Sequence, residues 1–256
     1  MLKTKIYSFD KKNDRTVLYL DGYMNVFYEK TEHLLKKMAK ELKNTNIIEI
    51  EAPHKVNQTH PFVLVRRLIF FEFFGRKRKT NGRMWFDFAR TLTVKEMVKL
   101  LFSWKKKNKK DIIKTAKEMT DRMHPELDAL SRKIDRTIKK LNLNPKKTII
   151  VGYSQGGMIA EYYVDKGMFR PKALVSIAGV PVLSEKEKQR KTQRPVPFHL
   201  IYGEKDPLIM PELQKARKVR PNATEEVLKN TQHIITEKMV DQTIHWIKEN
   251  ERSKSA

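Results

Sequence analysis

The 256-residue chain contains no cysteine. Disulfide frameworks, zinc sites built on thiolates and cysteine nucleophiles are therefore excluded, so any nucleophile must be an oxygen or nitrogen group. Long apolar runs are also absent, because no stretch reaches the roughly 18 apolar residues of a membrane-spanning helix. The N-terminal segment MLKTKIYSFDKKNDRTVLYL lacks the apolar core of a secretory signal. We therefore expect a cytoplasmic protein.

Acidic residues are scarce relative to basic ones. The 54 lysines and arginines outnumber the 30 aspartates and glutamates and give a formal net charge of +24. Such an excess attracts phosphates, anionic lipid headgroups or acidic proteins through a long-range, salt-sensitive field. The alternative interpretation is that lysine merely fills polar surface positions, in which case the charge indicates no particular partner.

Short β-branched or aromatic runs alternate with helical patterns along the chain. This alternation predicts an α/β fold with a mostly parallel sheet covered by helices on both faces, and the chain length suits a single domain. Chemistry in such folds gathers at the carboxyl ends of the strands. The predicted strands are Lys5–Phe9, Thr16–Leu20, Ile47–Ile50, Thr148–Tyr153, Ala173–Ile177 and Phe198–Tyr202, with a weaker one ending near Leu228, and the predicted helices are Thr31–Leu42, Ile112–Leu141, Ile159–Lys166 and Val240–Glu249.

The segment TIIVGYSQGGMIAEYYVD places Ser154 between a buried-strand pattern and a helical pattern. Gly152, Ser154 and Gly156 form a G-x-S-x-G motif, in which a serine at a strained strand-to-helix corner projects its hydroxyl above the sheet. The helix that follows presents free N–H groups that can stabilise an oxyanion. We interpret Ser154 as a nucleophile. The competing interpretation, a helix N-cap, leaves both glycines unexplained.

A serine nucleophile needs a base and an acid that orients it, and in an α/β-hydrolase the chain order is Ser, acid, His. Asp206 is the favoured acid because it lies beyond Gly203 and before Pro207 in the loop after the strand Phe198–Tyr202, and Glu204 is the alternative. His233 is the favoured base because it precedes the last helix in a loop. His245 lies within that helix and His199 within a strand, so both are interpreted as structural.

The remaining histidines do not have the spacing of metal ligands, so no metal site is predicted. An oxyanion hole requires two donors. One is the amide of Gln155, directly after the nucleophile, and the other is expected in the loop LDGYMNVF, where Gly22 lets the chain turn and Tyr23 or Met24 aims its amide inward.

At this level of detail the sequence resembles the phospholipase/carboxylesterase branch of the α/β-hydrolases, which includes the acyl-protein thioesterases. The matching segments are GYSQGG (152–157), YGEKDPLI (202–209), the late histidine, NGRMWFDF (81–88) and IEAP, which ends at Pro53. The pairing of S-Q-G-G with W-F-D is much more specific than G-x-S-x-G alone.

The resemblance implies an α/β-hydrolase fold with a Ser154, Asp206 and His233 triad and backbone donors at Gln155 and Tyr23. It further implies hydrolysis of carboxylic esters or thioesters without a cofactor. The chain departs from the family pattern in having Asp21 in place of histidine, Gln232 in place of the glycine before the catalytic histidine, and extra length on both sides of Trp85.

We expect one domain over residues 1–256, with cap or lid insertions at about 54–80 and 89–125. Thirteen basic and two acidic residues lie between Arg76 and Lys110. The apolar faces of Phe62–Phe74 and Val94–Trp104 would line an acyl pocket, and the lysine-rich surface would meet an anionic membrane or an acidic protein. An ordinary buried helix with a solvated lysine face is the alternative.

The leading function is therefore a serine esterase or thioesterase. Two alternatives stay open: a lysophospholipase or peptidase that uses the same triad, and an inactive α/β-hydrolase scaffold that acts as a binding module. Nucleic acid is not favoured as the partner of such a module, because no reader motif is present and the charge lies partly in the insertions.

Overall fold

A computed structural model describes residues 1–22, 28–55, 83–86, 109–182, 196–206, 209 and 223–252. Tyr23 and Met24 lie outside these residues, as do Phe62–Phe74 and Val94–Trp104. The cap insertions, the acyl pocket and the anionic partner of the basic surface therefore stay predictions. Within the described residues, no helix is both long enough and apolar enough to cross a membrane.

The described strands form a seven-stranded sheet in the order β1-β3-β2-β6-β7-β8-β9. All neighbouring pairs are parallel except β1 with β3. This arrangement confirms the predicted α/β fold with a mostly parallel sheet. The strands are β1 (Thr4–Ser8), β2 (Arg15–Leu20), β3 (Thr45–Ile50), β6 (Thr148–Tyr153), β7 (Ala173–Ile177), β8 (Phe198–Gly203) and β9 (Ala223–Leu228).

The central strands are buried along their whole length, because helices cover both faces of the sheet. Every residue of β6 is buried, and the same holds for β3, β7 and β8. The edge strand β9 is exposed at most positions and has the sequence ATEEVL. The near-continuous apolar runs of the inner strands are what a parallel sheet with two covered faces requires.

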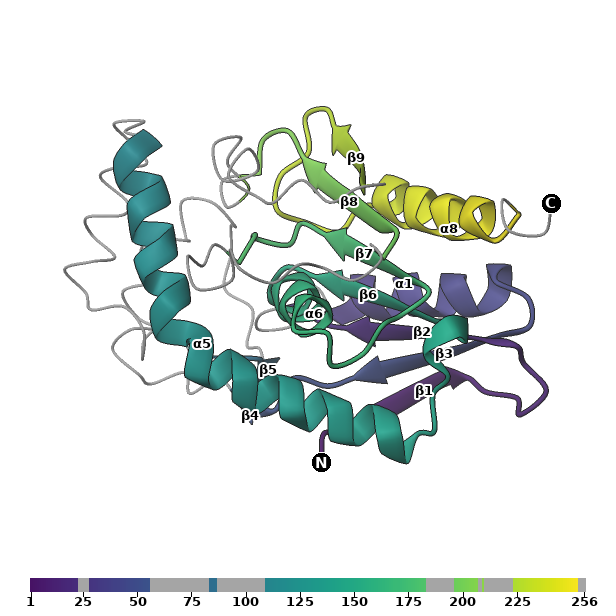
Figure 1. Ribbon diagram of the computed structural model, residues 1–256. Coiled ribbons are helices and arrows are strands. Elements are labelled where there is room, and N and C mark those ends of the chain that lie inside the picture. The colour runs from purple at the N-terminus through teal and green to yellow at the C-terminus, as the bar shows by residue number, and fades with distance from the viewer. Residues whose placement is uncertain are drawn as a thin grey trace.

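The described helices lie on both faces of the sheet (Figure 1). Helices α5 (Lys109–Lys140) and α6 (Gln155–Asp165) cover one face, and α1 (Tyr28–Glu41) and α8 (Glu237–Arg252) cover the other. The first and last helices of the described chain therefore share one side of the molecule.

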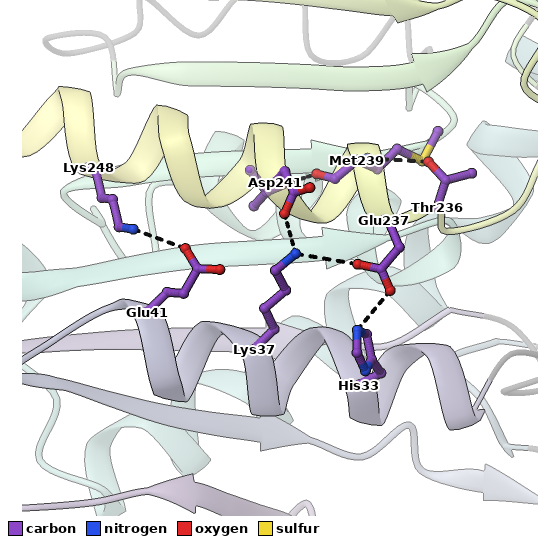
Figure 2. A network of polar contacts seen from close by, with 9 residues as sticks. His33, Lys37, Glu41, Thr236, Glu237, Met239, Asp241 and Lys248 are labelled. Atoms are coloured by element: carbon purple, nitrogen blue, oxygen red, sulfur yellow. Dashed lines mark hydrogen bonds and ion pairs between the residues drawn. The ribbon is translucent and has the colours of Figure 1, made fainter.

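Ion pairs join α1 to α8 across that side, as Figure 2 shows. Lys37 contacts both Glu237 and Asp241, and Lys248 lies 3.1 Å from the Glu41 carboxylate. Exposed ion pairs contribute little stability individually. These pairs connect α1 to both halves of α8, and α8 directly follows the loop that carries His233.

Helix α5 is longer than most helices in globular domains and contains Pro125 in its interior. An internal proline removes one backbone hydrogen bond, and the helix changes direction between its two halves (Figure 1). Near this point α5 is joined to α6, since the Tyr162 hydroxyl donates to Asp128 at 2.6 Å and contacts His124 Nδ1 at 2.9 Å.

The predicted strands and helices are all present with small shifts at their ends. The weak strand near Leu228 is the complete strand β9, parallel to β8. Two features were not predicted: a single 3-10 turn at Pro145–Lys147, and a short antiparallel pair formed by β4 (His54–Lys55) and β5 (Arg83–Met84). This pair places Trp85, directly after β5, next to the end of the main sheet.

Candidate active site

Ser154 occupies the corner between β6 and α6. Its φ is 51° and its ψ is −115°, a backbone conformation that residues with a side chain rarely adopt. The Ser154 N–H donates to the Ile177 carbonyl at 2.9 Å, which ties the corner to the end of β7. The hydroxyl makes no capping hydrogen bond to α6. The strained corner expected of a nucleophile is therefore present, and the helix-cap interpretation is not supported.

The glycines of the motif allow β2, β6 and α6 to approach closely. A Cβ atom on Gly152 would lie 2.5 Å from the Gly156 carbonyl oxygen, and one on Gly156 would lie 1.9 Å from the Leu20 carbonyl oxygen. Both distances are shorter than any real Cβ contact. The two glycines thus bring the first turn of α6 against the ends of two neighbouring strands.

Three predicted site residues from different loops come together at this corner. His233 Nε2 lies 2.9 Å from Ser154 Oγ, and His233 Nδ1 lies 2.6 Å from Asp206 Oδ2. All three residues are buried. Asp206 follows β8 and His233 follows β9, so the carboxyl ends of adjacent parallel strands deliver the acid and the base to the same edge of the sheet.

The alternative residues lie elsewhere. Glu204 is exposed, and its carboxylate accepts a hydrogen bond from the Asn230 N–H at 3.1 Å. His245 is on the exposed side of α8 and pairs with Glu249 at 3.1 Å. His199 is buried with its ring stacked on Trp246 at 4.9 Å. Each of the three alternatives therefore has a partner of its own outside the line from Asp206 through His233 to Ser154.

Tyr153, next to the serine, packs against His233 and is hydrogen-bonded to it. The two rings are stacked with their centroids 5.6 Å apart, and the Tyr153 hydroxyl donates to the His233 carbonyl at 3.3 Å. Burial, followed by the nearby Asp206 carboxylate, raises the pKa of the Tyr153 phenol well above its usual value, so the hydroxyl stays protonated as a donor. Sequence reasoning missed this role, because Tyr153 occupies the variable position before the serine of G-x-S-x-G, and that position carries no signal of its own.

The predicted oxyanion donors are described in part. Gln155 is the first residue of α6, where the N–H groups of the first turn have no partner within the helix. On the opposite side, the Asp21 carboxylate accepts the Gly22 N–H at 2.7 Å and so shapes the predicted turn. Burial, then the Glu49 carboxylate, raises the pKa of Asp21 to about 7. Tyr23, the second predicted donor, lies outside the described residues.

The side chain of Gln155 has a further role that the sequence did not reveal. Its Oε1 accepts the Trp85 N–H at 3.1 Å, and its Nε2 donates to the Phe86 carbonyl at 3.0 Å. The Trp85 indole in turn donates to the Asp21 carbonyl at 2.7 Å. Trp85 and Phe86, noticed only for their resemblance to a family motif, are therefore bound to both sides of the serine corner.

A doubly covered parallel sheet with a strained serine corner and a histidine–carboxylate pair at its carboxyl edge defines the class of the protein as an α/β-hydrolase. The family model described as phospholipase/carboxylesterase matches residues 80–251. The chain belongs to that family, which confirms the resemblance inferred from its motifs. It is a hydrolase of the esterase or thioesterase type. No curated protein matches the chain significantly.

Solved structures agree on the fold. The esterase PE8 is 20% identical and superposes with a TM-score of 0.60 over 97% of each chain. Acyl-protein thioesterase 2 of Zea mays is 14% identical, with a TM-score of 0.57 over 98% of this chain and 99% of its own. SOBER1 of Arabidopsis thaliana is 16% identical, with a TM-score of 0.55 over 92% and 98%.

Proposed function

We propose that this protein is a serine hydrolase that cleaves carboxylic esters or thioesters through an acyl-enzyme. The observation that carries the proposal is the unbroken line of contacts from Asp206 through His233 to Ser154 at a strained strand-to-helix corner. A serine hydroxyl is a weak nucleophile at neutral pH, and an oriented imidazole within hydrogen-bond reach is what activates it.

In the proposed reaction, His233 Nε2 takes the proton of the Ser154 hydroxyl as Oγ attacks the acyl carbonyl carbon. The tetrahedral intermediate collapses when the bond to the leaving oxygen or sulfur breaks, and the imidazolium returns its proton to that atom. Water then attacks the acyl-enzyme with His233 again as base, which releases the carboxylic acid and regenerates Ser154. Asp206 holds Nδ1 protonated and directed away from the serine.

The negative charge of the intermediate needs donors that are already in place. The Gln155 N–H, at the start of α6, is one proposed donor, and the Tyr23 N–H is the other. The resemblance to esterases and acyl-protein thioesterases supports the choice of an acyl substrate, since both classes transfer an acyl group to water.

The test is hydrolysis of p-nitrophenyl esters of graded chain length, and of matched thioesters, by the wild-type protein and Ser154→Ala. We expect turnover that the variant lacks and an optimum chain length that reports the acyl pocket. Ser131→Ala is a matched control, because Ser131 is buried in α5 and its hydroxyl has no hydrogen-bond partner among the described residues. Equal turnover by wild type and Ser154→Ala would contradict the proposal.

The remaining alternatives predict different results in the same assay. A lysophospholipase or a peptidase would share the dependence on Ser154 but would prefer a lysophospholipid or a peptide over the simple esters. An inactive binding module would show no turnover with any of these substrates.

A further inference from the structure

Trp85 is hydrogen-bonded to both backbone segments that border Ser154. Its indole Nε1–H donates to the Asp21 carbonyl at the end of β2, and its main-chain N–H donates to the Gln155 side chain at the start of α6. The three residues are buried, with exposed fractions of 0% for Trp85 and 4% for both Asp21 and Gln155. Because water does not reach these contacts, each one strongly restricts the geometry of its partners.

The Gln155 end of this connection is held at two points. The side-chain amide accepts from Trp85 with its oxygen and donates to the Phe86 carbonyl with its nitrogen. An amide that uses both of its ends on one backbone segment has a single orientation. The residue whose backbone N–H is the proposed oxyanion donor is thus fixed by its own side chain to residues 85–86.

The Asp21 end lies directly against the nucleophile. A Cβ atom on Gly22 would be 3.3 Å from Ser154 Cβ and 2.6 Å from the Tyr153 ring. The Asp21 carboxylate holds the Gly22 N–H, while the Asp21 carbonyl is held by the indole. Both polar groups of the Asp21–Gly22 peptide are therefore hydrogen-bonded, and this fixes the plane of the peptide that leads to the second proposed donor.

We propose that Trp85 is a positioning residue that, through the Gln155 side chain, sets the separation between the Asp21–Gly22 turn and the first amide of α6, and with it the shape of the oxyanion site. This inference rests on the proposed function. Oxyanion donors act at about 2.7–3.1 Å from the developing charge, and a displacement of about 1 Å can cost on the order of 100-fold in rate.

Two variants interrupt the connection at different bonds. Trp85→Phe removes the indole N–H and keeps an aromatic ring, and Gln155→Met removes both amide contacts and keeps the backbone N–H of residue 155. Trp246→Phe is the matched control, because its indole also makes a hydrogen bond, to Thr224 Oγ1 at 3.0 Å, but between α8 and β9. Far-UV circular dichroism and thermal melting establish that each variant is folded.

The readouts are kcat and KM for a p-nitrophenyl ester and the affinity for an alkyl trifluoromethyl ketone, whose adduct with a serine hydroxyl carries an oxyanion. We expect Trp85→Phe and Gln155→Met each to lower kcat and ketone affinity by about 10- to 100-fold, with KM within about threefold. The double variant should resemble the worse single variant, because both changes break one connection. Trp246→Phe should retain wild-type kcat.

The outcomes separate this inference from the proposed function. A wild-type protein that neither turns over the esters nor reacts with a fluorophosphonate at Ser154 would overturn the proposed function itself. The positioning role alone would be overturned if the wild type is active and both folded variants keep its kcat and ketone affinity. The same holds if the variants change only KM. Should Trp85→Phe fail to fold, Gln155→Met gives the decision by the same measures.

Discussion

Replacing Asp21 by asparagine should stabilise the protein at alkaline pH and have little effect at acidic pH. Asp21 is buried at the end of β2, and its carboxyl oxygen accepts the Gly22 N–H. Burial is the largest cause of its raised pKa, and the Glu49 carboxylate on the neighbouring strand adds to it, while Lys5 lowers it. An asparagine oxygen can accept the same hydrogen bond without the charge.

The magnitude follows from the two pKa values. The pKa of Asp21 rises from 3.8 in an unfolded chain to about 7 in the folded protein. The folded state therefore keeps a proton that the unfolded state loses, so the contribution of this group to stability is complete below pH 3.8 and is lost as pH rises through 7. At about 1.4 kcal/mol per pH unit the loss is on the order of 4 kcal/mol at pH 8. Asparagine has no charge to gain, so the variant does not lose this free energy of unfolding.

Urea unfolding of wild type and Asp21→Asn at pH 4, 5, 6, 7 and 8 measures this difference. We expect the variant to exceed the wild type in unfolding free energy at pH 8 and the gap to shrink steadily toward pH 4. Asp14→Asn is the control, because Asp14 is exposed and its pKa is lowered by its hydrogen bond to Lys147, so neutralising it should bring no gain at pH 8. Parallel curves for wild type and Asp21→Asn from pH 4 to 8 would refute the reasoning.

Three further predictions concern other parts of the molecule. Burial lowers the pKa of His199 to about 4, so the folded protein should lose stability as pH falls from 6.5 toward 4. His199→Phe should flatten this part of the acid unfolding curve, and an unchanged curve would contradict the assignment. Asp206→Asn should lower kcat by about 10³- to 10⁴-fold, because His233 loses its orienting carboxylate, whereas Glu204→Gln should stay within about threefold of wild type. A larger loss of ester hydrolysis in Glu204→Gln than in Asp206→Asn would instead favour Glu204 as the acid. Gly156→Ala should prevent folding, because its Cβ would lie 1.9 Å from the Leu20 carbonyl oxygen. Gly167→Ala, with φ of 69° and open space around it, should lower the free energy of unfolding by only about 1 kcal/mol in thermal unfolding. A soluble, native-like Gly156→Ala protein would contradict the close packing.

The mostly parallel sheet and the positions of its main strands along the chain could be predicted, because buried parallel strands are nearly continuous apolar runs. The segment TIIVGY at β6 is of this kind, and the serine corner follows it directly. The edge strand β9 gave only a weak signal, because ATEEVL is mostly exposed and held mainly by backbone bonds to β8. Pairing with a neighbour, which no local pattern encodes, makes it a full strand.

Ser154, Asp206 and His233 could be named from the sequence because the fold prescribes the order of the three residues along the chain. The contacts that surround them could not. Trp85 reaches Asp21 across 64 positions, and its partner Gln155 is a further 70 positions along the chain. Such contacts depend on how β4 and β5 return the chain to the sheet, and this two-residue pairing has no sequence pattern that predicts it.

The central claim is that Ser154 is the nucleophile of an acyl-transfer site, and mapping a covalent adduct tests it most directly. The protein is incubated with a fluorophosphonate and digested, and the modified peptide is sequenced by mass spectrometry, beside His233→Gln and Ser154→Ala. The account predicts one adduct, on Ser154, formed much more slowly in His233→Gln and absent from Ser154→Ala. No adduct on the folded wild-type protein, or an adduct on another residue that persists in Ser154→Ala, would contradict it.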